Sequence, residues 1–127
     1  MLILVAEDNP DNRALLSRRL ERAGWSVEVA VDGVEAVEKC LSLKPALVLM
    51  DVAMPRMSGL EATRILRADP TVAQTKIIAV TAHAMDANRI ECLEAGCNDF
   101  ATKPINFPEL MAMIRHHMGL DSEGVAA

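Results

Sequence analysis

The chain has few aromatic residues, few cysteines and no long apolar run. Aromatic residues make up 2% of its 127 residues and Tyr is absent, so the sequence offers little for stacking a flavin or another aromatic ligand. Its three cysteines, Cys40, Cys92 and Cys97, include no Cys-x-x-Cys pair, which favours small buried side chains over a zinc site. No apolar run approaches the roughly 20 residues needed to span a bilayer.

Basic residues are also fewer than acidic residues in this chain. The net charge is -5, which disfavours nucleic acid as a partner, because affinity for a phosphate backbone comes largely from Lys and Arg. The apolar start, Met1–Ala6, has no basic leader and runs directly into Glu7 and Asp8, unlike a secretory signal. We therefore expect a cytoplasmic protein with no membrane span.

The length suits one compact domain. We expect this domain to occupy residues 1–120 and to be followed by a flexible tail, residues 121–127, because the tail is made of small and weakly hydrophobic residues.

Short apolar runs alternate with amphipathic segments along the chain. The apolar runs predict strands at 2–6, 26–30, 46–50, 76–80 and, more weakly, 99–101, and the helical spacing predicts helices at 10–23, 33–43, 59–68, 84–95 and 107–118. Strands rich in Val, Ile and Leu with helices between them are typical of a parallel sheet covered on both faces. The sequence therefore predicts a three-layer α/β fold.

Polar side chains cluster at the predicted ends of four strands. Glu7 and Asp8 follow the first strand, Asp51 the third, Thr81 the fourth and Lys103 the fifth. The carboxyl ends of parallel strands share one edge of the sheet, where ligands bind in such folds. Because three neighbouring carboxylates repel one another, we expect a bound cation at this edge.

Mg²⁺ suits this set of side chains, because it prefers oxygen ligands and is commonly held by one or two carboxylates and by phosphate oxygens. Lys103 and Thr81 supply a positive charge and a hydroxyl donor that would stabilise a transferring phosphoryl group. Asp51 is then the expected nucleophile, since a carboxylate is a competent acceptor of phosphoryl groups.

A structural interpretation exists for each residue taken singly. Asp8 suits a helix cap, Thr81 a turn hydroxyl and Lys103 a solvated loop charge. Similarly, Arg13, Arg18, Arg19 and Arg22 are expected to form a solvated helical face. The joint occurrence of acidic, hydroxyl and lysine side chains at successive strand ends favours the phosphoryl site.

The motifs resemble those of response regulator receiver domains of two-component signalling. The resemblance extends from Leu2 to about His117 and rests on the segments Ile3–Asn9 (ILVAEDN), Leu49–Pro55 (LMDVAMP) with Ser58-Gly59, Ala79–Ala82 (AVTA) and Phe100–Pro104 (FATKP). It implies a flavodoxin-like (βα)5 fold, with a doubly wound parallel sheet of five strands in the order 2-1-3-4-5.

By this resemblance, Asp51 accepts a phosphoryl group from a histidine kinase or a histidine phosphotransfer protein in a Mg²⁺-dependent reaction. The implied metal ligands are Asp8 and Asp51 directly, Glu7 through water, and the backbone carbonyl of Ala53. Such a domain is a phosphoacceptor in a phosphorelay, and catalyses only its own phosphorylation and dephosphorylation. The resemblance also implies a cis peptide at Lys103-Pro104.

The resemblance further implies that Thr81 and Phe100 switch conformation on phosphorylation. The output surface for an unknown downstream protein would then be the fourth helix, fifth strand and fifth helix, at about 84–118. His83 and Ala53 are expected to flank the path of the hydrolytic water. Our hypothesis is that His83 tunes the phosphoryl lifetime, and the alternative is a solvent-exposed His83 without this role. The sequence leaves open whether this is a stand-alone regulator or the receiver of a hybrid histidine kinase.

Three other functions remain as alternatives. A Mg²⁺-dependent phosphatase with an aspartyl-phosphate intermediate would use similar chemistry, but a D-x-D motif is typical there and this chain has Asp8-Asn9-Pro10. A flavodoxin-like FMN carrier would need a Ser/Thr-rich loop where Glu7 and Asp8 stand. The third is a binding module that acts independently of phosphorylation.

Overall fold

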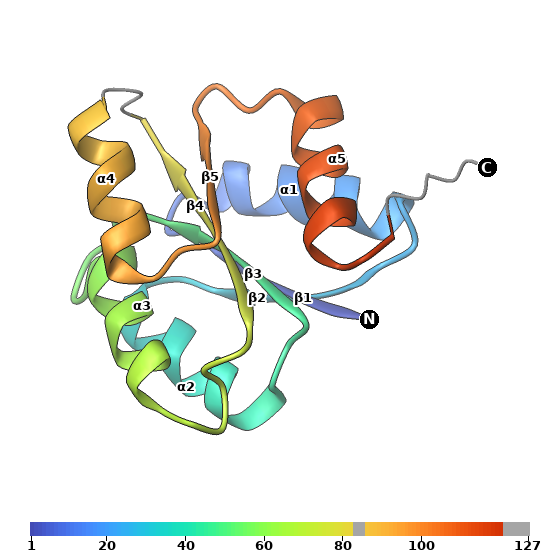
Figure 1. Cartoon of the computed structure of the whole chain (residues 1–127). Coiled ribbons are helices and arrows are strands. Elements are labelled where there is room, and N and C mark those ends of the chain that lie inside the picture. Colours follow the sequence, from blue (N-terminus) through green and yellow to red (C-terminus); the bar gives the residue numbers. More distant parts are fainter. Residues whose placement is uncertain (83–85, 121–127) are drawn as a thin grey trace.

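The computed structural model describes residues 1–82 and 86–120, in which strands and helices alternate (Figure 1). The strands are β1 (Leu2–Ala6), β2 (Ser26–Ala30), β3 (Leu47–Asp51), β4 (Lys76–Thr81) and β5 (Asp99–Thr102). The helices are α1 (Pro10–Arg22), α2 (Gly33–Leu43), α3 (Gly59–Ala68), α4 (Asp86–Ala95) and α5 (Phe107–His117). The expected tail, residues 121–127, lies outside the described residues.

The predicted ends of two strands need a correction at the carboxyl edge of the sheet. β3 runs one residue later than the predicted 46–50, and β4 continues past residue 80, so Asp51 and Thr81 are the last residues of their strands. Both side chains are buried. The pattern of apolar residues missed these ends because a polar residue at a strand end looks like the start of a loop.

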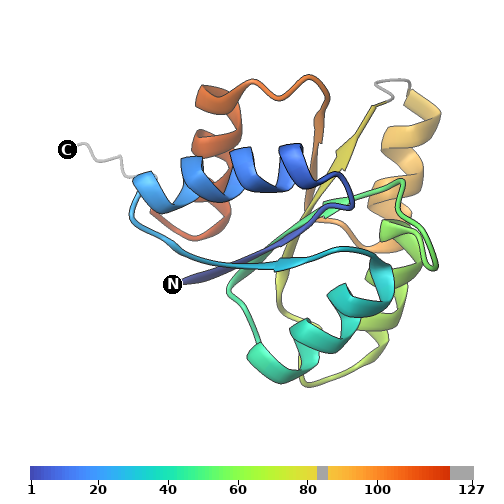
Figure 2. The same cartoon turned by 180° about the vertical axis from the view of Figure 1, so that it is seen from behind.

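The sheet is parallel and has the order β2-β1-β3-β4-β5. Helices α1 and α5 cover one face, and α2, α3 and α4 cover the other, as Figures 1 and 2 show from opposite sides. The predicted flavodoxin-like architecture is therefore confirmed. Because β1 pairs with both β2 and β3, the strand order reverses beside β1, where such folds open a crevice.

Alternate residues of each central strand enter separate core layers. In β1, Ile3 and Val5 belong to the layer that contains the buried residues of α1 and α5, whereas Leu4 and Ala6 belong to the layer beneath α2, α3 and α4. Since side chains of a strand point alternately to the two faces, a strand covered on both faces must be apolar throughout. This explains the uninterrupted apolar runs of the sequence.

The three cysteines behave as the sequence predicts. Cys40, Cys92 and Cys97 are free, buried and part of the core layer beneath α2, α3 and α4. Burial raises the pKa of the Cys40 thiol to about 12 and that of the Cys97 thiol to about 11. All three therefore serve as small apolar side chains.

Among the described residues, no helix has the length and apolar character to cross a membrane.

One arginine holds several loops together at the amino edge of the sheet. Arg67, near the end of α3, donates from Nε to the carbonyl oxygen of Gly96 at 2.7 Å. Its Nη1 donates to the carbonyl oxygens of Ala73 and Thr75, at 2.9 and 2.6 Å, and its Nη2 to Oδ1 of Asn98 at 2.7 Å. Arg67 thus joins α3 to the segments that enter β4 and β5.

We expect Arg67→Met to lower the free energy of unfolding by on the order of 3 kcal/mol, because several acceptors lose a charged donor while the apolar stem is retained. Urea denaturation of the two proteins measures the difference. Arg64→Met, on the exposed side of the same helix, is the matched control and should change stability by less than about 0.5 kcal/mol. Equal losses in the two variants would contradict the structural role of Arg67.

Candidate functional site

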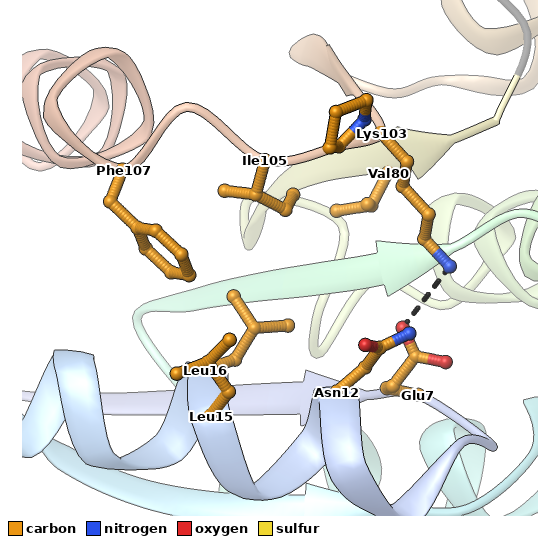
Figure 3. Close-up of a pocket in the computed structure, with 9 residues that line it drawn as sticks. Glu7, Asn12, Leu15, Leu16, Val80, Lys103, Ile105 and Phe107 are labelled. Carbon is orange, nitrogen blue, oxygen red and sulfur yellow. Dashed lines mark ion pairs between the residues drawn. The ribbon is translucent and has the colours of Figure 1, made fainter.

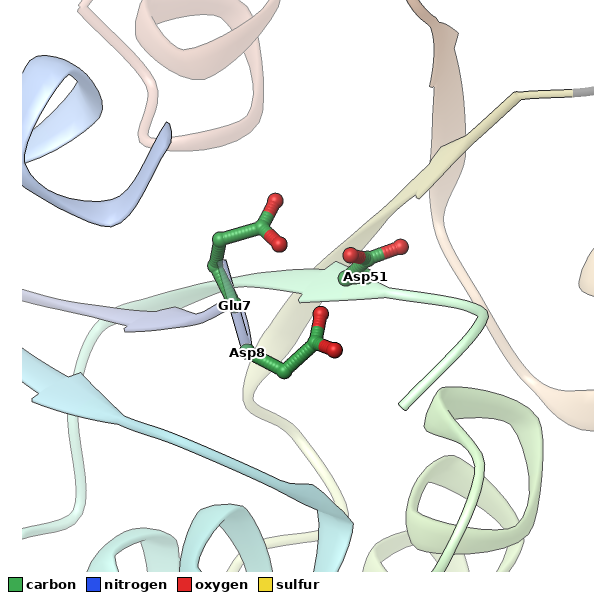
Figure 4. A group of neighbouring side chains, drawn as sticks. All are labelled: Glu7, Asp8 and Asp51. Atoms are coloured by element: carbon green, nitrogen blue, oxygen red, sulfur yellow. The ribbon is translucent and has the colours of Figure 1, made fainter. Parts of the chain in front are cut away.

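Three carboxylates meet where the strand order reverses. Glu7 and Asp8 follow β1, Asp51 ends the neighbouring strand β3, and one carboxylate oxygen from each lies within 4.8 Å of the others. Figure 4 shows the three side chains gathered over this edge of the sheet. Glu7 and Asp51 are buried, whereas Asp8 is exposed. The predicted acidic cluster is therefore present.

The turn that carries Glu7 and Asp8 is shaped by its neighbours. Asn9 is the N-cap of α1, and its side chain accepts from two backbone N–H groups of the first turn. The interpretation of Asp8 as the helix cap is therefore wrong. Arg13 Nη1 donates to the carbonyl oxygens of Glu7 and Asp8, at 3.0 and 3.3 Å.

This role of Arg13 was missed in the sequence, where Arg13 was assigned to a solvated face. Arg13 is half-buried and lies one turn before the buried Leu16 of α1, and its long side chain turns back over the preceding loop. The sequence did contain an indication of this role. Arg13 lies one helical turn after the N-cap Asn9, and a long side chain at that position can reach the carbonyl groups that precede the helix.

Lys103 brings positive charge into the cluster. Its Nζ donates to Oδ2 of Asp51 at 3.1 Å and lies 3.3 Å from Oε1 of Glu7. Partial burial by itself lowers the pKa of Lys103, but the hydrogen bond and charge of Asp51, together with Glu7, outweigh it and raise that pKa. Lys103 is therefore charged at neutral pH and is not the solvated loop residue considered above. The Lys103-Pro104 peptide is cis.

Most of the expected site residues share one cleft of about 300 Å³. Its lining consists of Glu7, Asp8, Asn9, Asn12, Asp51, Val52, Ala53, Thr81, Ala82 and Lys103. The described lining offers oxygen donors and no thiol or imidazole, which suits a hard cation such as Mg²⁺. Glu7, Asp8 and Asp51 are the residues that would hold the ion by their side chains.

Phe100 does not line this cleft. Phe100 is half-buried in β5, where it lines a separate cavity of about 400 Å³ against α5. The guanidinium of Arg89, on α4, lies 5.4 Å from the centre of the Phe100 ring. His83 lies outside the described residues.

An apolar hollow of about 500 Å³ adjoins the cleft between α1 and the segment after β5 (Figure 3). Leu16 of α1 and Ile105 and Phe107 of the opposite segment are among its walls, and Lys103 and Glu7 border it. The hollow therefore places apolar walls beside the ion pair of Lys103 and Glu7.

Comparisons with known proteins agree with this geometry. The family model described as "Response regulator receiver domain" matches residues 3–115. The polar-differentiation response regulator DivK of Brucella anthropi is 32% identical over 117 residues, which are 92% of this chain and 95% of DivK.

Two solved structures are also similar. The receiver domain of the sensor histidine kinase PA1611 from Pseudomonas aeruginosa, with a magnesium ion coordinated in its active-site cleft, has 36% identity and a TM-score of 0.87, covering 93% of this chain and 97% of that one. A Saccharomyces cerevisiae structure of the phosphotransfer protein Ypd1 with the receiver domain of Ssk1 has 29% identity and a TM-score of 0.88, covering 96% and 91% of the two chains.

The acidic cluster predicts opposite effects of one substitution with and without metal. In EDTA, Asp8→Asn removes one of three mutually repelling charges, so we expect the Tm to rise by about 2–4 °C. With Mg²⁺ added, the wild type should gain more stability than the variant, because the variant has lost a ligand. Thermal unfolding followed by circular dichroism measures both effects.

Asp11→Asn is the control for this experiment. Asp11 lies in the first turn of α1, where a negative charge favours the helix, so its removal should leave the Tm unchanged or slightly lower. A lower Tm for Asp8→Asn in EDTA would show that the cluster is not under electrostatic repulsion.

Proposed function

The chain belongs to the response regulator receiver domain family, and on this premise we propose that it accepts a phosphoryl group from a phosphohistidine donor onto Asp51, with Mg²⁺. The observation that carries the proposal is the convergence of three carboxylates and Lys103 on one cleft. The domain is a signalling phosphoacceptor rather than a conventional enzyme.

Asp51 is suited to act as the nucleophile. It ends a central strand, its backbone is fixed in the sheet, and Lys103 and the backbone N–H of Ala53 hold its two carboxylate oxygens, at 3.1 and 3.3 Å. In the transfer, a carboxylate oxygen forms the new bond to phosphorus. The bond from phosphorus to the imidazole nitrogen breaks, and its electron pair stays on the donor histidine.

The remaining site residues would stabilise negative charge. Mg²⁺, when bound, would offset the repulsion between the carboxylates and the incoming phosphoryl group. Lys103 would keep its ammonium beside the reacting oxygen, and the Thr81 hydroxyl, which lines the same cleft, would donate to the phosphoryl group. His83, two residues beyond Thr81, is proposed to tune the lifetime of the phosphoryl group.

Phosphorylation would be communicated to the surface of the domain through a change in side-chain packing. Thr81 and Phe100 lie on the adjacent strands β4 and β5, so a shift of Thr81 toward the phosphoryl group would change the space available to Phe100. Phosphorylation then favours one of two packings by its contacts with Thr81. The surface formed by α4, β5 and α5 would present this change to a downstream protein.

The relatives support the proposed class of phosphoryl donor. The Ypd1–Ssk1 structure pairs a histidine phosphotransfer protein with a receiver domain, which supports a phosphotransfer protein or a histidine kinase as the donor here. DivK is named a response regulator, and the PA1611 receiver is part of a sensor histidine kinase. The proposed chemistry is the same in either setting.

We expect incubation with acetyl phosphate and Mg²⁺ to add one phosphoryl group to the wild-type protein and none to Asp51→Asn. Intact-mass spectrometry measures the added mass. Asp11→Asn, which changes a nearby exposed carboxylate, should be phosphorylated like the wild type. An unmodified, folded wild-type protein would overturn the proposal and favour a binding module that acts independently of phosphorylation.

Lys103→Gln should separate metal binding from phosphoryl transfer. The substitution removes the ammonium that competes with a metal for Asp51 and Glu7, so Mg²⁺ should bind more tightly. Phosphorylation should nevertheless slow by roughly 10²-fold, because the group that stabilises the developing charge is lost. Calorimetric titration and a phosphorylation time course measure the two effects.

Lys76→Gln, at the opposite edge of the sheet where β4 begins, should change neither quantity. Equal phosphorylation rates in Lys103→Gln and the wild type would exclude the role given to Lys103.

A further inference from the structure

An ion pair connects the loop after β2 to the loop after β3. Arg56 Nε donates to Oδ2 of Asp32 at 2.8 Å, and Arg56 Nη2 donates to Oδ1 of Asp32 at 3.4 Å. The Asp32 carboxylate is 9% exposed, whereas the Arg56 side chain is 62% exposed. Arg56 therefore reaches inward from the surface to a buried acceptor, and this two-point geometry restricts the loop that carries it.

Asp32 is itself fixed in position. It is the N-cap of α2, and its Oδ1 accepts from the backbone N–H of Glu35 at 2.8 Å. That backbone hydrogen bond and the hydrogen bond from Arg56 lower the pKa of Asp32, so the carboxylate is charged at neutral pH. The partner of Arg56 is thus a rigid, ionised group on the end of a helix.

Arg56 also has an unusual backbone. Its φ is 66°, in the left-handed region that residues with a side chain seldom adopt. The next residue packs backbone against backbone on α2, because a Cβ on Gly33 would lie 2.2 Å from the carbonyl oxygen of Met57. The surroundings must therefore hold this part of the loop in place.

The inner end of the same loop forms the rim of the acidic cleft. The backbone N–H of Gly59 donates to the carbonyl oxygen of Val52 at 2.9 Å, which closes the loop at its base. Ala53, exposed and in the lining of the cleft, lies between this base and Arg56. Arg56 and Ala53 therefore belong to the same closed loop.

We propose that Arg56 and Asp32 are positioning residues: their ion pair holds the loop after β3 so that the backbone of Ala53 is placed for Mg²⁺. This inference rests on the proposed function, since it concerns the same cleft. Neither residue contacts the cleft lining through its side chain in the described contacts, so their effect is exerted through the loop.

Simple electrostatics predicts a different result, which makes the proposal testable. If Arg56 acted only as a distant positive charge near an acidic cleft, its removal would tighten Mg²⁺ binding. If it positions the loop, Arg56→Gln weakens binding. The sign of the change therefore distinguishes the two explanations.

The experiment measures Mg²⁺ affinity by isothermal titration calorimetry, and amide hydrogen exchange at Ala53 and Met57 in the metal-free protein. We expect Arg56→Gln to raise the Kd by about tenfold, as is typical for partners that orient metal ligands, and to speed exchange. Asp32→Asn, which keeps an N-cap acceptor, should do the same. The double variant should be no weaker than the single ones, and Arg56→Lys should recover part of the affinity.

Arg64→Gln, an exposed arginine on α3, is the matched charge control and should leave the Kd unchanged or lower. Unchanged or tighter Mg²⁺ binding in Arg56→Gln, with a wild type that binds the ion, would overturn the positioning role and leave the proposed function intact. A folded wild type that binds no Mg²⁺ would overturn both. Circular dichroism verifies that each variant is folded.

Discussion

The repulsion among Glu7, Asp8 and Asp51 is the constraint on which the rest of the structure depends. The fold gathers them because β1 and β3 are neighbours at the reversal of strand order, and it buries two of the three. Lys103 offsets part of the repulsion from across the cleft. What remains is excess negative charge, which a divalent cation would offset; without such a cation the cleft would repel an incoming phosphoryl group.

The sequence predicted the three-layer α/β class well because two simple periodicities indicate it, whereas the strand order 2-1-3-4-5 came from the resemblance to receiver domains. Strands such as β3, buried on both faces, appear as continuous apolar runs, and the helices between them show one apolar face. The position of the site could also be predicted from the sequence, since residues at the carboxyl ends of parallel strands must share an edge of the sheet. Asp51 and Thr81 were placed just beyond their strands only because polarity was taken to end a strand.

The supporting contacts were not predictable in the same way. Arg13, Arg56 and Arg67 each reach carbonyl or carboxylate oxygens of other segments with a long side chain. Periodicity gives the direction in which a Cα–Cβ bond points, but it says little about where a guanidinium several bonds away will end. Such contacts also join loops whose relative positions exist only after the sheet has formed.

The cluster of hydrogen bonds around Arg67 has a mechanical consequence. It stiffens the amino edge, where α3 and the approaches to β4 and β5 are held by one guanidinium, whereas the opposite edge of these strands carries the charged cleft. Strands that are held at their amino ends have less freedom to slide past one another. If phosphorylation displaces residues at the cleft, as proposed, the fixed amino ends would limit how far β4 and β5 can slide past their neighbours.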